Sequence, residues 1–450
     1  LLNGILRGYT AYRACPRRRG GRSGWNPLGT RTKPPACVAV GDPASCAVCG
    51  GAGPDQGTSL VLIAHFIKMG DVPAIKAAET RPAQCAVRFQ CLRKRLDGQA
   101  RTLRKALALH PALRNVLTGV DGAAHELDTP PAVFAPAFAM CRRAGIQHVT
   151  YHAGEEFRHL VQGLRTIHEA INFLDMREGD RIGHAVAAGI DPAMWRRAVA
   201  DRHCGPGALR MPQEDVLDDA VVSRRLLTQR GGPVATIAKL DEDIASLSAR
   251  IYGNPHQPSV LYAAWRMRKL NTWLLFDPRF RDLPFDSDSP TFERYCETLA
   301  FDRDHRRDLW DLHKAARGDP AAFDVLRQRE SWPVRKRGEA LIEVNPDDYE
   351  DATLWALQQE ILKEIKDKRI VLEAMPSSNV RIAPYESYRE HHIFRWLGVR
   401  GVAGLHGDDR ETFDEHHPTV VLGSDDPGIF ATNIRNEAAH LHLTLQNEFG

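Results

Sequence analysis

Long apolar runs are lacking in this sequence of 450 residues, so we expect no membrane-spanning helix and no membrane partner. The N-terminal region also lacks the basic start, apolar core and small-residue cleavage site of a signal peptide. Neither sign of charge dominates, because 60 Lys and Arg stand against 57 Asp and Glu. A net charge of +3 gives little reason to expect a nucleic-acid partner. The length suits one large α/β domain with insertions, or two to three ordinary domains.

A disulfide framework is lacking as well. The nine cysteines are odd in number and scattered along the chain. We therefore expect a reducing, cytoplasmic setting. An initiator Met is also absent, since the chain opens on Leu1, and from this we expect that its beginning is missing.

Residues 13–58 show neither helical nor strand periodicity and are rich in glycine. Three cysteines in this segment are candidate zinc ligands, namely Cys37, Cys46 and Cys49. The last two have good ligand spacing, but a structural zinc needs four ligands, and only Cys15 or His65 could complete the set. A basic arm for nucleic acid is a second interpretation. We favour a third, a poorly ordered insertion.

Apolar strands alternate with amphipathic helices in the first part of the chain. The strands are expected at 59–67, 115–121, 146–152 and 179–184, and the helices at 86–109, 131–144 and 157–174. This alternation predicts a parallel sheet flanked by helices. The first strand is expected to be buried, with His65 as a core histidine.

The strand rhythm stops between residues 192 and 366. Charged helices are expected there at 241–251, 259–275 and 349–368, with their charges on a solvated face. Strands return at 369–374 and 419–423, followed by a closing helix that runs to Leu445. We therefore expect an N-terminal part of a barrel at 1–191, a helical insertion at 192–366, and the C-terminal part of the barrel at 367–450.

Polar residues stand at the carboxyl ends of four of these strands, which is where α/β barrels carry their chemistry. They are His152 with Glu155, His184, Asn379, and Asp425 with Asp426. A lone strand-end His is usually a helix cap, and Asp before Pro is a common helix start. The four ends together instead predict a hydrolase with one metal ion, because imidazoles and carboxylates suit zinc.

Four short motifs resemble those of the adenosine deaminases in the amidohydrolase superfamily, and they follow that family's order. They are His-Ala-Gly-Glu at 152–155, Arg-Ile-Gly-His at 181–184, Pro-Ser-Ser-Asn at 376–379 and Ser-Asp-Asp-Pro at 424–427. The resemblance covers about residues 113–192 and 369–440, and it implies a (β/α)8 TIM barrel. The insertion and the phrases at 2–9 and 421–430 look most like the adenosine deaminase component of the bacterial RADAR phage-defence system. That likeness implies a role in antiviral defence, with a homo-oligomer or a defence-complex partner.

The resemblance also implies roles for individual residues. His152 and Asp425 would be zinc ligands. Glu155 would protonate the purine ring nitrogen, and His184 would orient and activate the zinc-bound hydroxide. The implied reaction is the hydrolysis of adenosine to inosine and ammonia.

Three further positions bear on the substrate. Asp426 would hold the purine ring, and Ala124 falls where the family has a Gly whose backbone N–H meets the substrate. Asn3 stands where the family has a substrate-binding Asp. Two zinc ligands belong to a strand 1 motif, His-x-His-Leu-Asp-Gly, in which Leu1 would replace the second His and the first would precede the chain.

This departure leaves two classes of function open. One is a zinc-dependent deaminase acting on adenosine, impaired if the strand 1 ligands are lost. The other is a non-catalytic barrel that serves assembly or ligand binding. An amidohydrolase acting on another purine, such as adenine or a nucleotide, is a nearer alternative to the first.

Overall fold

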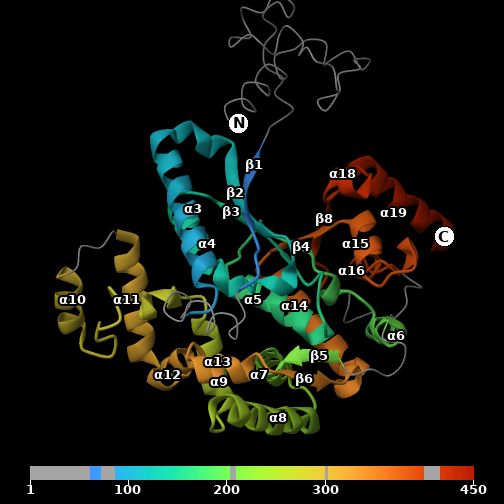
Figure 1. The fold of residues 1–450 in the computed structure, drawn as a ribbon. Helices are drawn as coiled ribbons and strands as arrows, with labels where there is room; N and C mark the ends of the chain where they lie inside the picture. The colour runs from blue at the N-terminus through green and yellow to red at the C-terminus, as the bar shows by residue number, and fades with distance from the viewer. Residues whose placement is uncertain (1–60, 72–86, 203–208, 299–302, 400–415, 450) are drawn as a thin grey trace, which may run out of the picture. The chain divides into compact units, whose positions relative to one another are not determined.

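The computed structural model describes residues 61–71, 87–202, 209–298, 303–399 and 416–449 (Figure 1). The chain divides into two compact units, of which the larger comprises Ile63–Arg114 and Thr118–Gly450. Of the smaller unit, only residues 61–62 and 115–117 are described. The strand 1 motif at Leu1, the candidate zinc ligands Cys37, Cys46 and Cys49, and Asn3 lie outside the described residues.

The centre of the larger unit is a six-stranded sheet whose strands follow one another in chain order. The strands are β1 (Leu62–Ile67), β2 (Leu117–Ala123), β3 (His148–Ala153), β4 (Arg181–His184), β7 (Val371–Ala374) and β8 (Thr419–Leu422). Every pair from β2 to β8 is parallel. A sequential parallel order is that of an α/β barrel, whereas doubly wound sheets reverse direction at a switch point. The α/β class with helices around a parallel sheet is therefore confirmed. In the described residues, β1 and β8 do not pair, so closure of the barrel is not seen.

Helices connect the strands as the alternation predicts. They are α3 (Gln90–Leu109), α4 (Ala135–Arg143), α5 (Leu160–Phe173) and α14 (Asp351–Asp367). Helix α5 begins at His159, whose ring accepts a hydrogen bond from the Val161 N–H at 3.2 Å and so satisfies one free donor of the first turn. Helices α5 and α14 pack against each other (Figure 1). On each helix, apolar residues spaced three and four apart form one face, and these two faces make the buried interface.

Strand β1 differs from the prediction, because most of its side chains are not buried. Val61, Ile63 and Ile67 are 58%, 44% and 51% exposed. The strand lies at one edge of the described sheet, and of its six residues only Phe66 is buried. His65 is accordingly not a core histidine, since its side chain is 49% exposed.

The segment between β4 and β7 is helical, as expected, but it also contains a two-stranded antiparallel sheet that the sequence did not indicate. This sheet pairs β5 (Leu209–Pro212) with β6 (Leu341–Val344). The helices are α6 (Pro192–Arg202), α7 (Gln213–Arg230), α8 (Val234–Tyr252), α9 (Pro258–Met267), α10 (Ser289–Glu297), α11 (Arg303–Gly318), α12 (Pro320–Arg329) and α13 (Trp332–Gly338). Four-residue strands separated by more than a hundred residues carry too little periodicity to be recognised.

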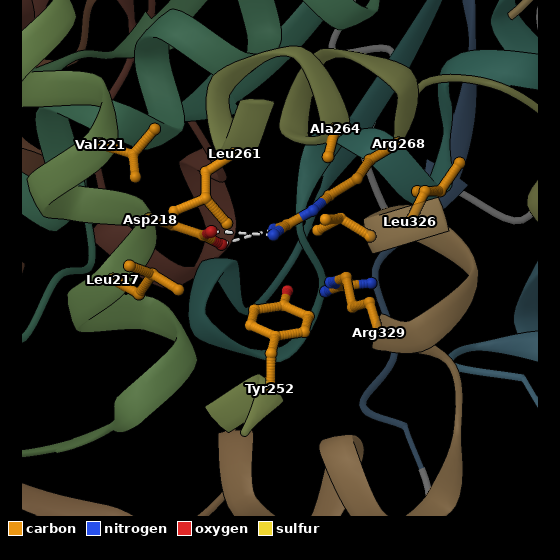
Figure 2. Close-up of a pocket in the computed structure, with 10 residues that line it drawn as sticks. Leu217, Asp218, Val221, Tyr252, Leu261, Ala264, Arg268, Leu326 and Arg329 are labelled. Carbon is orange, nitrogen blue, oxygen red and sulfur yellow. Dashed lines mark hydrogen bonds and ion pairs between the residues drawn. The ribbon is translucent and has the colours of Figure 1, made fainter. Parts of the chain in front are cut away.

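Several charges in this segment are buried, which differs from the expectation that its charges lie on a solvated face. Arg268 donates to both oxygens of Asp218, with Nη2 2.8 Å from Oδ1 (Figure 2). Glu214 accepts from Arg329, and its Oε2 lies 2.5 Å from Nη2 of Arg88. The carboxylates at 214 and 218 are only 4% and 5% exposed. The neighbouring cavity of about 10 Å³ holds no more than about one water, so the cluster joins the helices and binds no substrate.

The chain after β7 forms the short helices α15 (Pro376–Ile382), α16 (Ile393–Trp396) and α18 (Pro427–Phe430), and then α19 (Ile434–Glu448). Helix α19 is the expected closing helix. No helix among the described residues is both long and apolar enough to cross a membrane.

Candidate active site

The register of β3 and β4 brings two histidines to one edge of the sheet. His152 is paired with Gly183, and Ala153 with His184. A Cβ on Gly183 would stand 2.8 Å from Cδ2 of His152, so the glycine makes room for that imidazole. The rings of His152 and His184 lie 5.2 Å apart between centroids.

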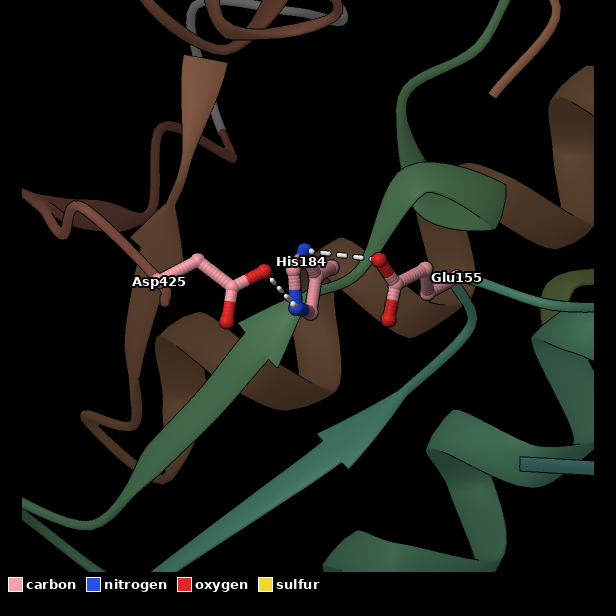
Figure 3. Close-up of side chains that lie close together, drawn as sticks. All are labelled: Glu155, His184 and Asp425. Atoms are coloured by element: carbon pink, nitrogen blue, oxygen red, sulfur yellow. Dashed lines mark ion pairs between the residues drawn. The ribbon is translucent and has the colours of Figure 1, made fainter. Parts of the chain in front are cut away.

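Three groups converge at this edge, from the ends of three strands (Figure 3). Nδ1 of His184 is 3.3 Å from Oε1 of Glu155, and its Nε2 is 3.9 Å from Oδ2 of Asp425. One donor atom from each residue lies within 4.8 Å of the others. His184 and Asp425 have positive φ angles of 63° and 52°, which non-glycine residues rarely adopt.

Asp121, near the end of β2, lies between the imidazole rings of His152 and His65. Its Oδ1 is 3.3 Å from Nδ1 of His152, and its Oδ2 is 2.8 Å from Nδ1 of His65. Burial would raise the pKa of Asp121, but the two histidine hydrogen bonds outweigh it and lower the pKa to about 2. Asp121 is therefore an anion beside Nδ1 of His152, while Nε2 of that ring has no partner in the part of the chain that the structure describes.

Glu155 occupies an apolar, acidic environment. Burial, followed by the charges of Glu126 and Asp425, raises its pKa to about 8. A carboxyl group of this kind is protonated at neutral pH and can act as a general acid. It also lines a cleft of about 880 Å³, a volume that suits a nucleoside-sized ligand.

The turn that carries Glu155 is held by a second carboxylate. Glu126 accepts hydrogen bonds from three successive backbone N–H groups, those of Gly154, Glu155 (2.8 Å) and Glu156 (2.9 Å). Lys68 donates to the carbonyl of His152 at 2.6 Å and lies 4.5 Å from the Tyr151 ring. Both charged groups are buried, at 7% and 3% exposure.

Residues of α15 reach the site from the other side. Ser378 donates its hydroxyl hydrogen to Oδ2 of Asp425 at 2.7 Å. Asn379, which is fully buried, lies 2.8 Å from Nδ1 of His184 through its Nδ2. The expected strand-end residues His152, Glu155, His184, Asn379 and Asp425 are thus near one another.

The described residues that were predicted to bind substrate, Ala124 and Asp426, are more exposed than the histidines and carboxylates above. Asp426 is exposed and stands at the N-cap position of α18, where its side chain makes no capping hydrogen bond. Asp426 therefore occupies the start of a helix, but its carboxylate does not cap that helix. Ala124 is exposed and has a φ of 93°, a conformation that favours the glycine expected there. Asn3 is outside the described residues.

The donor set fits a zinc ion. Imidazole nitrogens and carboxylate oxygens are its usual ligands, and a metal-binding His typically has a carboxylate beside its other ring nitrogen, as His152 has Asp121 at 3.3 Å. Geometry alone groups Glu155, His184 and Asp425 as potential ligands, whereas the sequence motifs favour His152 and Asp425.

Comparison with known proteins bears on the same region. Residues 63–204 match the adenosine deaminase family. This deaminase-like segment runs from β1 to the end of α6 and includes His152, Glu155 and His184. The motifs around Asn379 and Asp425 fall outside it.

Known deaminases are similar over part of this chain. An adenine deaminase from Ralstonia pickettii is 32% identical over 31% of the chain and 38% of its own length. An adenosine deaminase from Klebsiella pneumoniae is 36% identical over 26% of the chain and 32% of its own length. An N6-methyl-AMP deaminase from Xenopus laevis is 30% identical over 30% of the chain and 33% of its own length. The chain thus matches about a third of the length of these relatives.

Three residues of the site, Asp121, Glu126 and Lys68, were not assigned a role from sequence. Asp121 ends the strand expected at 115–121 and Glu126 follows it, so the strand-end position was the available signal. His65 lies in β1, where it was interpreted as a core histidine, and Lys68 directly follows that strand.

Proposed function

We propose that this chain is a zinc-dependent hydrolase that deaminates the adenine ring of adenosine or a related purine. The observation that carries the proposal is Glu155, a half-buried carboxyl with a pKa of about 8 that lines a cleft and lies 3.3 Å from His184. Its place within a segment that matches adenosine deaminases supports the same reaction class.

His152 and Asp425 would hold the zinc ion, together with ligands from outside the described residues. When bound, zinc lowers the pKa of water towards ~7 and so supplies a nucleophile at neutral pH. Glu155 donates its proton to a purine ring nitrogen, and His184 orients the attacking oxygen. Asp426 and the Ala124 N–H would contact the purine. The amino group leaves as ammonia.

The test is the ultraviolet absorbance of adenosine incubated with the purified chain and added zinc. We expect a fall that a chelator abolishes and that Glu155→Gln reduces at least ~100-fold, since Gln keeps the shape but cannot donate the proton. Glu156→Gln is the matched control and should retain activity. An active Glu155→Gln protein would refute the mechanism. No change with the unaltered chain would favour the non-catalytic barrel.

Adenine and AMP in the same assay separate the related substrates. We also propose a narrower assignment to phage defence in the cytoplasm, as part of a homo-oligomer or defence complex, on the likeness of the insertion and two short phrases. Phage plating on cells with and without Glu155→Gln tests this assignment, and equal plating would refute it.

A further inference from the structure

A chain of buried hydrogen bonds leads from His391, which precedes α16, to His184. His391 Nε2 is 3.2 Å from Oδ1 of Asn379, and Asn379 Nδ2 is 2.8 Å from Nδ1 of His184. All three side chains are at most 1% exposed. Water therefore cannot replace any of these contacts, and each polar atom must be satisfied within the chain.

The tautomer of His391 is fixed by the backbone. The Ile393 N–H donates to Nδ1 of His391 at 3.0 Å, so Nδ1 is an acceptor. In the neutral ring, the proton must then reside on Nε2. His391 consequently donates to Oδ1 of Asn379.

The Asn379 amide is fixed by two donors. The Met375 N–H donates to Oδ1 at 3.3 Å, in addition to the Nε2–H of His391. Rotating the amide by 180° would place its NH2 group against both donors and leave the Met375 N–H without an acceptor. The NH2 group therefore faces His184.

We infer that His391 is a positioning residue that, through Asn379, fixes His184 as the tautomer with its proton on Nε2, so that His184 donates to the reacting oxygen and does not ligate the metal. A proton on Nδ1 could instead face Oε1 of Glu155 at 3.3 Å, but it would then meet the Asn379 N–H at 2.8 Å. Two N–H groups cannot point at each other between Nδ2 of Asn379 and Nδ1 of His184, because a hydrogen bond needs an acceptor.

This assignment explains the geometry on the other side of the ring. Nε2 of His184 lies 3.9 Å from Oδ2 of Asp425 (Figure 3), which is too far for a hydrogen bond and leaves the Nε2–H available to a substrate group. A protonated Nε2 has no lone pair for an ion. His152, whose Nδ1 faces Asp121, has no partner for its Nε2 among the described residues and is the imidazole able to ligate. The inference rests on the proposed function only for what His184 does to a substrate, because its tautomer is a property of the chain itself.

The test is nitrogen-15 NMR of the whole chain labelled in histidine, which distinguishes protonated from unprotonated ring nitrogens. The His184 signals are assigned by their loss in His184→Gln. His313 is an internal control, because its Nδ1 lies 2.7 Å from the Phe285 carbonyl and should carry the proton, the opposite tautomer. This measurement needs no activity, so its result is independent of the absorbance assay.

We expect His184 to show a protonated Nε2 and an unprotonated Nδ1. His391→Phe should move its Nδ1 signal towards the protonated range, whereas His391→Gln, whose amide can still donate to Asn379, should restore the original pattern. A protonated Nδ1 in the unaltered chain would overturn the inference, as would an unchanged tautomer in a folded His391→Phe protein. If His391→Phe does not fold, the unaltered chain still decides the tautomer.

Discussion

Replacing Glu126 by Gln tests whether this buried carboxylate holds the turn that carries the general acid. Its two oxygens accept three backbone N–H groups, one from Gly154 on Oε1 and those of Glu155 and Glu156 on Oε2. Burial raises the pKa of Glu126, while the positive charge of Lys68 and these donors oppose that rise. Because both oxygens accept N–H groups, the ionised form fits the geometry.

The magnitude follows from the donors that Gln cannot satisfy. A hydrogen bond to a charged acceptor is worth about 1.5–3 kcal/mol, against about 0.5–1.5 kcal/mol for a neutral one. In Glu126→Gln one bond is lost to a facing NH2 group and two become neutral. Burying a neutral amide in place of a charge offsets part of this, which leaves a net loss of about 2–4 kcal/mol.

Urea unfolding followed by circular dichroism measures this loss. Glu156→Gln is the matched control, because the Glu156 side chain accepts one N–H group, that of Glu126, at 3.0 Å, and is 35% exposed. We expect the control to lose no more than about 1 kcal/mol. Equal stabilities of the two variants would refute the argument that Glu126 anchors the turn.

Four further outcomes are expected. Ala124→Gly should stabilise the chain by about 0.5–1 kcal/mol in urea unfolding, because its φ of 93° strains an Ala, and a loss would contradict this. Gly183→Ala should weaken zinc binding about tenfold in calorimetry by displacing His152, and unchanged affinity would remove that residue from the ligand set. Deamination should decline as pH rises through about 8, since burial raises the pKa of Glu155 and its proton is needed; a rate that climbs through that pH is the contrary result. Arg268→Met should cost about 3–5 kcal/mol of unfolding free energy, because it leaves a buried carboxylate unpaired, and a loss below about 1 kcal/mol would show that the ion pair contributes little.

The strands, the helices between them and the strand-end residues could be predicted from sequence for one physical reason. Parallel strands end at the same edge of a sheet, so Glu155, His184 and Asp425 meet there once the strands are found. The family match and the sequential sheet order confirm the fold class that this alternation indicated.

Other features depend on contacts between residues that are far apart in the chain. Glu214 and Arg329 are 115 residues apart, and each alone has the composition of a solvated helix. His65 sits in an apolar run, but its exposure depends on β1 being an edge strand. The hydrogen-bond chain through His391 lies outside every motif, and only the packing of its loop against α15 brings it to Asn379.

The placement of His184 shows why a motif predicted the site better than periodicity did. Side chains alternate between faces along a strand, and His184 is paired with Ala153, one residue beyond His152. Continued extended backbone would therefore direct the two imidazoles to opposite faces. The left-handed φ of 63° at His184 ends the strand and redirects its ring, while Gly183 leaves the space that His152 fills. The glycine and the left-handed backbone of the following histidine thus bring the two ring centroids to 5.2 Å of each other. The motif Arg-Ile-Gly-His contains both residues, whereas a hydrophobic pattern indicates neither.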